Sequence, residues 1–368
     1  MTGEESAAAA ELGGRVAAGV AAIVQDVQRA VSSRVERLTG PPAAPVHAAQ
    51  KAISGGVYAA VRGSLTLASK GIGAAAAARA DGQSARDASS PRARAVVAAV
   101  NGAAGGLLAD EGSPWAIPLT ARAHGEPTQR VAVLLHGLGE SDSSWRSDPD
   151  YRLLLRELGW TPLLVRYNSG RRVWQNGSEL SERLESLLAE WAVPVTEIAL
   201  VGHSMGGLVA RSAVHAAQAQ SAAWVADVTR LITLGTPHEG APLARFGHLA
   251  RGLLSRVPET RPLATVIDFD RAPGIDDLRR GDVHELPEAQ GTPQPDHIRV
   301  RTLCATLARS EQHPVSRVLG DLLVMAPSAT STSSGRRADD DRRHLGGLHH
   351  FDLLGHPEAA DQLRAWMQ

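Results

Sequence analysis

One serine stands in a setting that favours nucleophilic chemistry. Ser204 is the centre of Gly202-His203-Ser204-Met205-Gly206, a G-x-S-x-G pattern. The β-branched run 198–201 predicts a strand directly before this pattern, and the segment after it predicts a helix. In such a turn the serine is strained and its neighbours must lack bulk, a need that Gly202 and Gly206 meet. The sequence therefore predicts that Ser204 is a nucleophile at a helix N-terminus; the alternative is a glycine-rich turn with a capping serine.

Acyl transfer at a serine also needs two N–H groups that stabilise the oxyanion. The amide of Met205, directly after the nucleophile, is the first predicted donor. The second is predicted at Leu138, because the run 131–135 leads into a loop where Gly137 and Gly139 let the backbone approach a substrate oxygen. His136 is interpreted as a histidine that orders this loop.

Three segments follow one another along the chain: LLHGLGES at 134–141, VGHSMGGLVAR at 201–211 and LGTPHEGAPLA at 234–244. Together they resemble α/β-hydrolases of the bacterial lipase/esterase group, which includes triacylglycerol lipases and lipase-like proteins related to the GPI inositol-deacylase domain. The resemblance covers roughly residues 112–368. It implies a carboxylic ester hydrolase that works through an acyl-enzyme on Ser204, with its triad in the order Ser, acid, His and with no cofactor or metal.

The same resemblance points to the base. The segment from Gly347 to Leu354 is similar to the lipase signature N-H-L-D, and in that alignment His350 is the base while His349 takes the asparagine position. Adjacent residues project differently, so only one of the two is expected to face Ser204, and the alignment favours His350.

For the acid, Asp321 and the segment that follows it resemble the family's D-G-L-V segment, with Leu322 where the family has glycine. Asp321 follows the predicted strand 298–304 and precedes the base. Four other carboxylates also lie between nucleophile and base but come before that strand, and they are interpreted as solvated side chains of an insertion: Asp268, Asp270, Asp276 and Asp277.

The remaining histidines could be catalytic or could bind a metal ion, and the sequence argues against both roles. His238 precedes the expected acid and is interpreted as a loop-ordering residue. The C-terminal histidines lack an H-E-x-x-H pattern, which argues against a zinc site. Asp352 matches one calcium position of some relatives, but His356 stands where an oxygen ligand would be needed, so no metal is expected.

Predicted strands and helices alternate along the part of the chain that contains these residues. Short apolar runs at 131–135, 163–165, 198–201, 231–234 and 298–304 predict buried strands, and segments at 151–158, 177–191, 205–218 and 242–254 predict helices. This alternation predicts an α/β fold with a mostly parallel sheet. More than sixty residues separate two of the strands, so an insertion at about 237–297 is expected to form a lid over the site.

The chain divides by composition near residue 110. Residues 1–110 are rich in alanine and show helical apolar spacing, whereas all seven tryptophans lie in 111–368, the expected catalytic domain. The polar faces of the N-terminal helices carry mixed charge, which favours packing on the catalytic domain over the alternative of peripheral contact with lipid.

Overall composition narrows the function classes. A net charge of −1 argues against a nucleic-acid partner, and a single cysteine excludes an internal disulfide framework. No secretory signal is visible, so a cytoplasmic protein with an ester or lipid-like small-molecule substrate is expected. Acyl transfer with the same triad, and a lipid-associated protein without catalysis, are the alternative functions.

Overall fold

The computed structural model of the chain describes residues 91–113, 116–240, 272–285, 294–313 and 341–368, together with Ser316, Gly320, Asp321, Leu323, Val324 and Ser328. The predicted N-terminal helices before residue 91, the predicted helix 242–254 and most of the predicted lid lie outside the described residues. Within the described part, no helix is long and apolar enough to cross a membrane.

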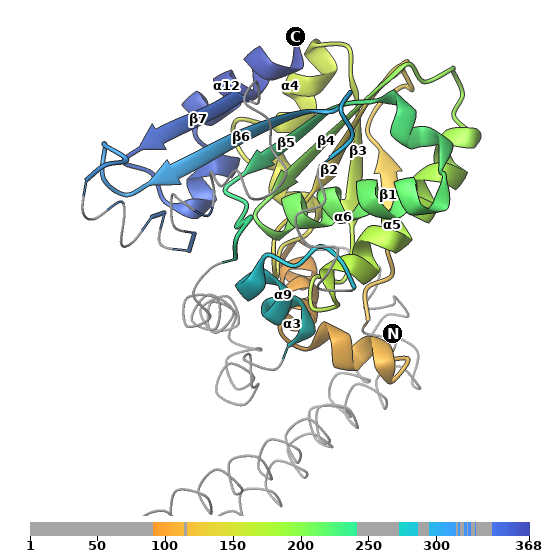
Figure 1. The fold of residues 1–368 in the computed structure, drawn as a ribbon, viewed down its shortest axis with the longest axis horizontal. Coiled ribbons are helices and arrows are strands. Elements are labelled where there is room, and N and C mark those ends of the chain that lie inside the picture. Colours follow the sequence, from red (N-terminus) through yellow and green to blue (C-terminus); the bar gives the residue numbers. More distant parts are fainter. Residues whose placement is uncertain are drawn as a thin grey trace, which may run out of the picture.

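A central sheet organises the described residues (Figure 1). Its strand order is β1-β3-β2-β4-β5-β6-β7, and every neighbouring pair is parallel except β1 with β3. The strands are β1 (Thr120–Ala123), β2 (Arg130–Leu135), β3 (Thr161–Arg166), β4 (Glu197–His203), β5 (Val228–Leu234), β6 (Arg299–Thr306) and β7 (Asp341–Gly346). The mostly parallel α/β fold predicted from the sequence is thus confirmed.

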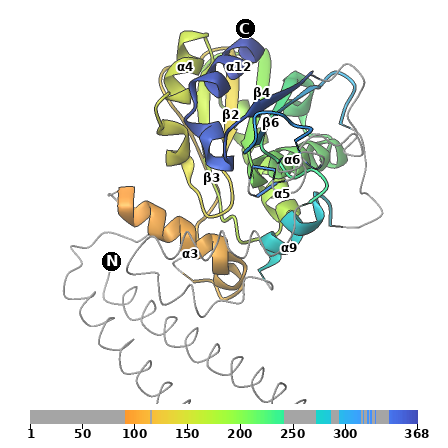
Figure 2. The same ribbon diagram turned by 90° about the vertical axis from the view of Figure 1, so that its left-hand side faces the viewer.

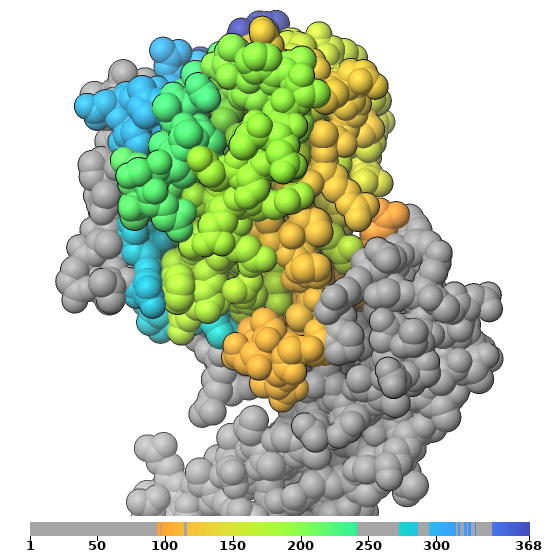
Figure 3. All heavy atoms as spheres, turned by 90° about the vertical axis from the view of Figure 1, so that its right-hand side faces the viewer, coloured from red at the N-terminus to blue at the C-terminus, as the bar shows by residue number. Residues whose placement is uncertain are grey.

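Helices cover both faces of this sheet, as Figures 1 and 2 show. On one face α5 (Val173–Ala189) packs against α6 (Met205–Gln220), and α6 in turn contacts β4 and β5. On the other face lie α4 (Tyr151–Glu157) and α12 (Pro357–Met367), which contact each other. In the space-filling view of Figure 3, the segment that contains α5 lies at the outer surface of the molecule.

Successive side chains of β2 lie alternately in two apolar clusters, one on each face of the sheet, so helices must cover both faces. Val131, Val133 and Leu135 belong to the apolar cluster beneath α5 and α6. Ala132 and Leu134 belong to the cluster beneath α4 and α12. Because successive side chains of a strand point to opposite faces, a continuous apolar run is the pattern of a strand buried on both sides.

All five predicted strands are present. Four are longer than predicted by one to three residues at one or both ends, and β6 begins one residue later and ends two residues later than the predicted 298–304. Two strands were not predicted from the sequence, β1 and β7, which lie at the two edges of the sheet. β7 reads Asp-Arg-Arg-His-Leu-Gly, and none of its residues is fully buried. An edge strand with polar side chains lacks the apolar run on which the prediction depended.

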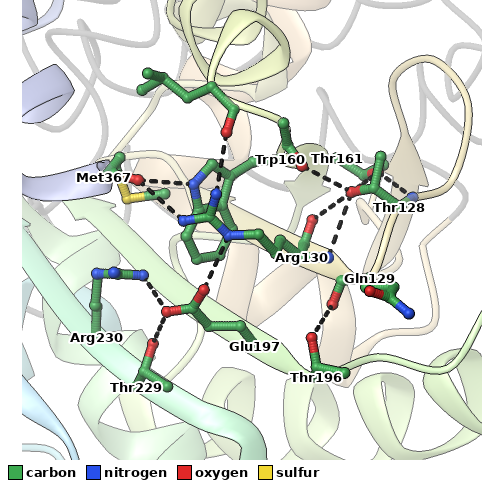
Figure 4. Close-up of polar contacts among 12 residues, drawn as sticks. Thr128, Gln129, Arg130, Trp160, Thr161, Thr196, Glu197, Thr229, Arg230 and Met367 are labelled. Atoms are coloured by element: carbon green, nitrogen blue, oxygen red, sulfur yellow. Dashed lines mark hydrogen bonds and ion pairs between the residues drawn. The ribbon is translucent and has the colours of Figure 1, made fainter.

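A polar cluster ties the strands together at the amino edge of the sheet (Figure 4). Nε of Arg130 donates to Glu197 at 2.9 Å, and Arg230 pairs with the same carboxylate. The Arg130 guanidinium also lies 4.1 Å from the centre of the Trp160 ring, and Trp160 donates to the carbonyl of Met367 at 2.9 Å. The start of β2, β4 and β5 and the C-terminus are therefore joined at one point.

Two further helices lie at the opposite, carboxyl edge of the sheet, α3 (Pro91–Asp110) and α9 (Pro273–Arg280), and they contact each other (Figure 2). α3 packs closely on two loops of the sheet. A Cβ atom at Gly102 would lie 2.7 Å from Cα of Gly139, and the side chain of Asn168 donates to the carbonyl of Gly105 at 2.8 Å. The last part of the alanine-rich region is thus in contact with the loop that follows β2.

Candidate active site

Ser204 lies in a sharp turn between β4, which ends at His203, and α6, which begins at Met205. Its backbone has φ 53° and ψ −122°, a conformation that non-glycine residues rarely adopt. Hydrogen bonds hold the turn on both sides: the amide of Ser204 donates to Leu234 at 2.8 Å, and Thr236 donates to the Ser204 carbonyl at 2.9 Å. The strand–turn–helix predicted around this serine is present.

The glycines of the turn are required by close backbone contacts. A Cβ atom at Gly202 would lie 2.3 Å from the amide nitrogen of Gly207. A Cβ atom at Gly206 would lie 2.2 Å from the carbonyl oxygen of Leu135, at the end of β2. Approaches of this kind leave no room for any side chain, so α6 can begin directly against the end of β2 only with glycine there.

The loop after β2 leaves one amide without a partner. The amide of Gly137 donates to Glu140 at 2.9 Å, and the amide of Gly139 donates to the hydroxyl of Ser169 at 2.9 Å. Among the described residues, the amide of Leu138 between them makes no hydrogen bond, and neither does the amide of Met205. Because buried N–H groups are normally paired, two unpaired amides at these positions are available to bind an oxyanion.

His350 and Asp321 meet in the structure. Nδ1 of His350 lies 2.7 Å from Oδ2 of Asp321, and both side chains are 2% exposed. The other carboxylate oxygen accepts the amides of Leu323 and Val324, at 3.0 and 2.8 Å, and the Asp321 carbonyl accepts the amide of His350 at 3.0 Å. The carboxylate is therefore fixed by its own loop, and it sets the orientation of the imidazole.

The second ring nitrogen of His350 has no partner within the described part of the chain. Nε2 is buried and makes no hydrogen bond there, including with Ser204. The ring lies beside the turn of the nucleophile, because its Cε1 would be 3.1 Å from a Cβ atom at Gly235, and its centre is 4.9 Å from that of His203. The His350 ring thus lies beside His203 and Gly235, and its Nε2 has no partner among the described residues.

His349 is oriented differently. Its side chain is half exposed, and Nε2 lies 3.1 Å from the carboxylate of Asp352, which also accepts the amide of His349 at 2.8 Å. Of the two adjacent histidines weighed as the base, only His350 contacts Asp321.

The other carboxylates weighed as the acid lie elsewhere or outside the described residues. Asp268 and Asp270 are outside them, as is Leu322. Asp276 and Asp277 lie in α9, where both pair with Arg172, at 3.1 and 2.6 Å. The interpretation of Asp277 as a solvated side chain is wrong: it is 2% exposed and accepts the amide of Val173 at 2.7 Å, so it joins α9 to the start of α5.

His136 and His238 are buried and connect their loops to neighbouring elements of the sheet. The ring of His136 stacks on Tyr167 at 4.2 Å, and its Nε2 accepts the Tyr167 amide at 3.3 Å. Nε2 of His238 lies 3.2 Å from the hydroxyl of Thr233. These contacts agree with the interpretation of both as loop-ordering residues.

The C-terminal histidines do not converge on a common point. His344 bonds to Thr306 at 2.8 Å, and Nδ1 of His356 accepts the amide of Glu358 at 3.3 Å. Among the described residues, no group of three or more histidine, cysteine or acidic side chains could hold a metal ion.

One buried ion pair was not anticipated from the sequence. Nδ1 of His203 lies 3.1 Å from Oε1 of Glu140, and the two side chains are 0% and 9% exposed. Burial by itself would raise the pKa of Glu140, but the charge and hydrogen bond of His203 lower it to about 2. Glu140 lies within the segment LLHGLGES, but His203 occupies a variable position of G-x-S-x-G, so the sequence held no signal that the two meet.

Comparison with known proteins supports the fold. Residues 178–257, which include the turn at Ser204, match the family model described as a PGAP1-like alpha/beta domain. No curated protein matches the sequence.

Among solved structures, the chain is similar to the mature lipase BlEst2 of Bacillus licheniformis, with 19% identity, a TM-score of 0.46, and coverage of 68% of this chain and 98% of that one. It is similar to the esterase RhEst1 of Rhodococcus sp. ECU1013, with 16% identity, a TM-score of 0.42, and coverage of 68% and 95%. It is also similar to the RedJ thioesterase of Streptomyces coelicolor, with 19% identity, a TM-score of 0.42, and coverage of 68% and 95%.

The topology and the site agree with the family match. The sheet is parallel apart from its first strand, helices cover both faces, and the strained serine stands between β4 and α6. Taken with the match of residues 178–257, these features show a fold of the α/β-hydrolase type.

Proposed function

We propose that the protein is a serine hydrolase that cleaves carboxylic esters through an acyl-enzyme on Ser204. The observation that carries the proposal is the arrangement of His350. One ring nitrogen is held by Asp321 at 2.7 Å, while the other is buried without a partner beside the strained turn of Ser204. A base oriented by a carboxylate and placed next to a serine is the arrangement that activates a hydroxyl nucleophile.

In the first half of the proposed reaction, Oγ of Ser204 attacks the ester carbonyl while Nε2 of His350 takes the hydroxyl proton. The amides of Leu138 and Met205 donate to the oxyanion of the tetrahedral intermediate. The bond to the leaving alcohol then breaks, and His350 returns the proton to that alcohol. Asp321 holds the ring in the tautomer with a proton on Nδ1 and stabilises the imidazolium without taking the proton itself.

In the second half, water attacks the acyl-serine and His350 takes a proton from it. Collapse of the second intermediate releases the carboxylic acid and returns the proton to Ser204. The Ser204–His350 hydrogen bond is not formed in the structure, which is common in unliganded enzymes because catalytic hydrogen bonds often tighten only when substrate is bound.

The experiment that tests this function uses Ser204→Ala and a matched control. Ser186 is an exposed serine in α5 that donates to the Glu182 carbonyl at 3.0 Å, so Ser186→Ala is the control. Wild type and control are expected to hydrolyse p-nitrophenyl esters and to react with a fluorophosphonate, whereas Ser204→Ala does neither. Labelling of the Ser204→Ala protein at a different serine would contradict the assignment.

Substrate class is read from the same assay. Rates on p-nitrophenyl esters of increasing acyl length show whether the enzyme prefers short or lipid-like chains. Analysis of the products in the presence of an added alcohol separates hydrolysis, which yields the free acid, from acyl transfer, which yields a new ester.

A further inference from the structure

The ion pair of His203 and Glu140 lies between the two loops that the proposed reaction uses. Glu140 belongs to the loop after β2, and its carboxylate accepts the amide of Gly137 at 2.9 Å. On the opposite side of the ring, Nε2 of His203 lies 3.3 Å from the carbonyl oxygen of His350. One imidazole therefore bridges the loop that contains Leu138 and the loop that contains the base.

The chemistry of the two partners determines the protonation of His203. A carboxylate oxygen and a carbonyl oxygen both accept hydrogen bonds and cannot donate them. Both ring nitrogens of His203 must therefore carry a proton if both contacts are hydrogen bonds, which makes the ring a cation. A neutral ring would direct a lone pair at one of the two oxygens, and such a contact in a fully buried site is unfavourable.

His136, a second buried histidine, lies in the loop after β2, and its ring has different kinds of hydrogen-bond partner from those of His203. Its Nδ1 lies 2.9 Å from the carbonyl oxygen of Gly137, an acceptor, whereas its Nε2 faces the amide of Tyr167, a donor, at 3.3 Å. One acceptor and one donor are satisfied by a neutral ring with its proton on Nδ1. The two histidines thus provide a matched pair in which the partners dictate different charges.

From these contacts we propose that His203 is a positioning residue that carries two ring protons at neutral pH. Paired with Glu140, it fixes the distance between the oxyanion-binding loop and the base His350, across the nucleophile that follows it in the chain. This inference rests on the proposed function for its catalytic consequence, but the charge of His203 and the link between the loops can be measured without any substrate.

The charged surroundings agree with this assignment. Burial lowers the pKa of His203, but the charge and hydrogen bond of Glu140 raise it by more, so that the net shift is upward, with smaller contributions from the His350 carbonyl and from Asp321. Three further titratable groups face this region. They are His350, whose ring centre is 4.9 Å away, His136, which acts on Glu140, and Tyr167, whose pKa is raised by burial and by the charge of Glu140. For His136 the same burial dominates and lowers the pKa, because no carboxylate accepts from its ring.

Each cation near the nucleophile is then matched by one carboxylate. His203 is paired with Glu140, and the imidazolium that forms on His350 during the reaction is paired with Asp321. Without Glu140, a positive charge on His203 would oppose the transient positive charge on His350, since like charges at this separation repel.

The first test reads the charge directly. Long-range ¹H–¹⁵N spectra of the histidine rings, assigned with His203→Gln and His136→Gln, distinguish rings with two N–H groups from rings with one. At pH 7 His203 is expected to carry two protons and His136 one. A neutral His203 at pH 7 would overturn the proposal.

The second test reads the link between the loops. Glu140→Gln keeps the shape and an acceptor for the Gly137 amide but removes the charge that keeps His203 protonated. Amide hydrogen exchange is expected to become faster at His350, in the remote loop, as well as at Gly137. Glu179→Gln, which alters a partly exposed carboxylate paired with Arg171, is the control and leaves both loops unchanged. Faster exchange confined to the 137–140 loop would show that no link exists.

Kinetics then separate a positioning role from a merely structural one. Glu140→Gln and His203→Gln are each expected to lower kcat by about 10- to 100-fold, with KM changed by less than about 3-fold, because misplacement of reacting groups acts on the transition state. The double variant should lose no more than either single variant, since the pair acts as a unit.

Additive losses, or losses that fall on KM alone, would contradict the positioning role. Melting temperature and circular dichroism show that each variant is folded. If wild type itself hydrolyses no ester, the proposed function fails, while the ring spectra and the exchange data still decide the charge and the link.

Discussion

Oδ2 of Asp321 lies 2.7 Å from Nδ1 of His350, although the two residues are 29 positions apart in the chain. The Asp321 carbonyl accepts the His350 amide at 3.0 Å as well, so the two residues are joined by both backbone and side chain. This double contact keeps the imidazole in one orientation and leaves Nε2 as the nitrogen that can take a proton.

The role of Asp321 is tested by Asp321→Asn. An amide of the same shape supports the wrong imidazole tautomer, and the corresponding change in a serine protease lowers kcat about 10⁴-fold. We expect a loss of at least about 100-fold in kcat on a short-chain ester. Asp276→Asn, in α9, is the control and should change kcat by only a few fold, because that carboxylate pairs with arginines away from the base. Retained activity in Asp321→Asn would move the acid elsewhere.

The two adjacent histidines are separated by a pair of substitutions. His350→Ala should lower kcat by about 10³-fold or more, as expected when a triad member is removed. His349→Asn should stay largely active, because His349 is half exposed and contacts only Asp352. Rates of the two variants on the same ester decide the matter, and the reverse pattern would make His349 the base.

The polar cluster at the amino edge of the sheet is expected to contribute stability rather than activity. Arg130→Ala removes a cation from the face of Trp160 and a charged hydrogen bond to Glu197, which together should cost about 2 kcal/mol of the free energy of unfolding. Urea unfolding measures this loss. Activity per folded molecule should be unchanged, because Arg130 and Glu197 stand at the start of β2 and β4, whereas Ser204 follows the end of β4.

Arg130→Lys extends this test to geometry. A single ammonium group cannot reach Glu197, the carbonyl of Leu158 and that of Met367 together, as the guanidinium does at 2.9, 3.1 and 3.2 Å. Lysine at this position is therefore expected to recover less than half of the lost stability. Full recovery would show that only the charge matters.

The ion pair of Glu140 and His203 predicts a window in the pH dependence of stability. The pKa of Glu140 falls in the folded state from 4.5 to about 2, so its contribution is present above pH 4.5 and is lost as pH falls toward 2. The pKa of His203 is raised from 6.5, so its contribution is complete below pH 6.5 and is lost as pH rises through the folded value.

The difference in unfolding free energy between wild type and Glu140→Gln should therefore be greatest between about pH 4.5 and 6.5. Denaturant unfolding of both proteins from pH 3 to 9 measures it. A difference that is constant across this range would show that the pair is not ionised in the folded protein.

What could be predicted from the sequence was local or carried by a family pattern. The turn at Ser204 is encoded within a dozen residues, because the strand, the glycines and the helix follow one another directly. Asp321 and His350 were selected by resemblance, and nothing in their spacing alone indicated that their side chains meet.

Contacts between distant segments could not be predicted. His203 and Glu140 are 63 positions apart, and Asp277 and Arg172 are 105 apart. In the sequence, Asp277 and Glu140 each look like solvated loop carboxylates. Asp277 is buried only because α9 packs on the start of α5, and Glu140 only because the loop after β2 packs on β4. The pattern of residues along the sequence does not show which distant side chain will pair with each of these carboxylates.

The contact between Gly102 and Gly139 has a practical consequence for dissecting the protein. The composition boundary near residue 110 suggests a fragment that begins at 111, but such a fragment would lack α3 and would leave the backbone of Gly139 and the side chain of Asn168 uncovered. The loop that we propose to bind the oxyanion would then lose the contacts of Gly139 and Asn168 with α3, next to the amide of Leu138. A fragment that preserves this loop must therefore include α3.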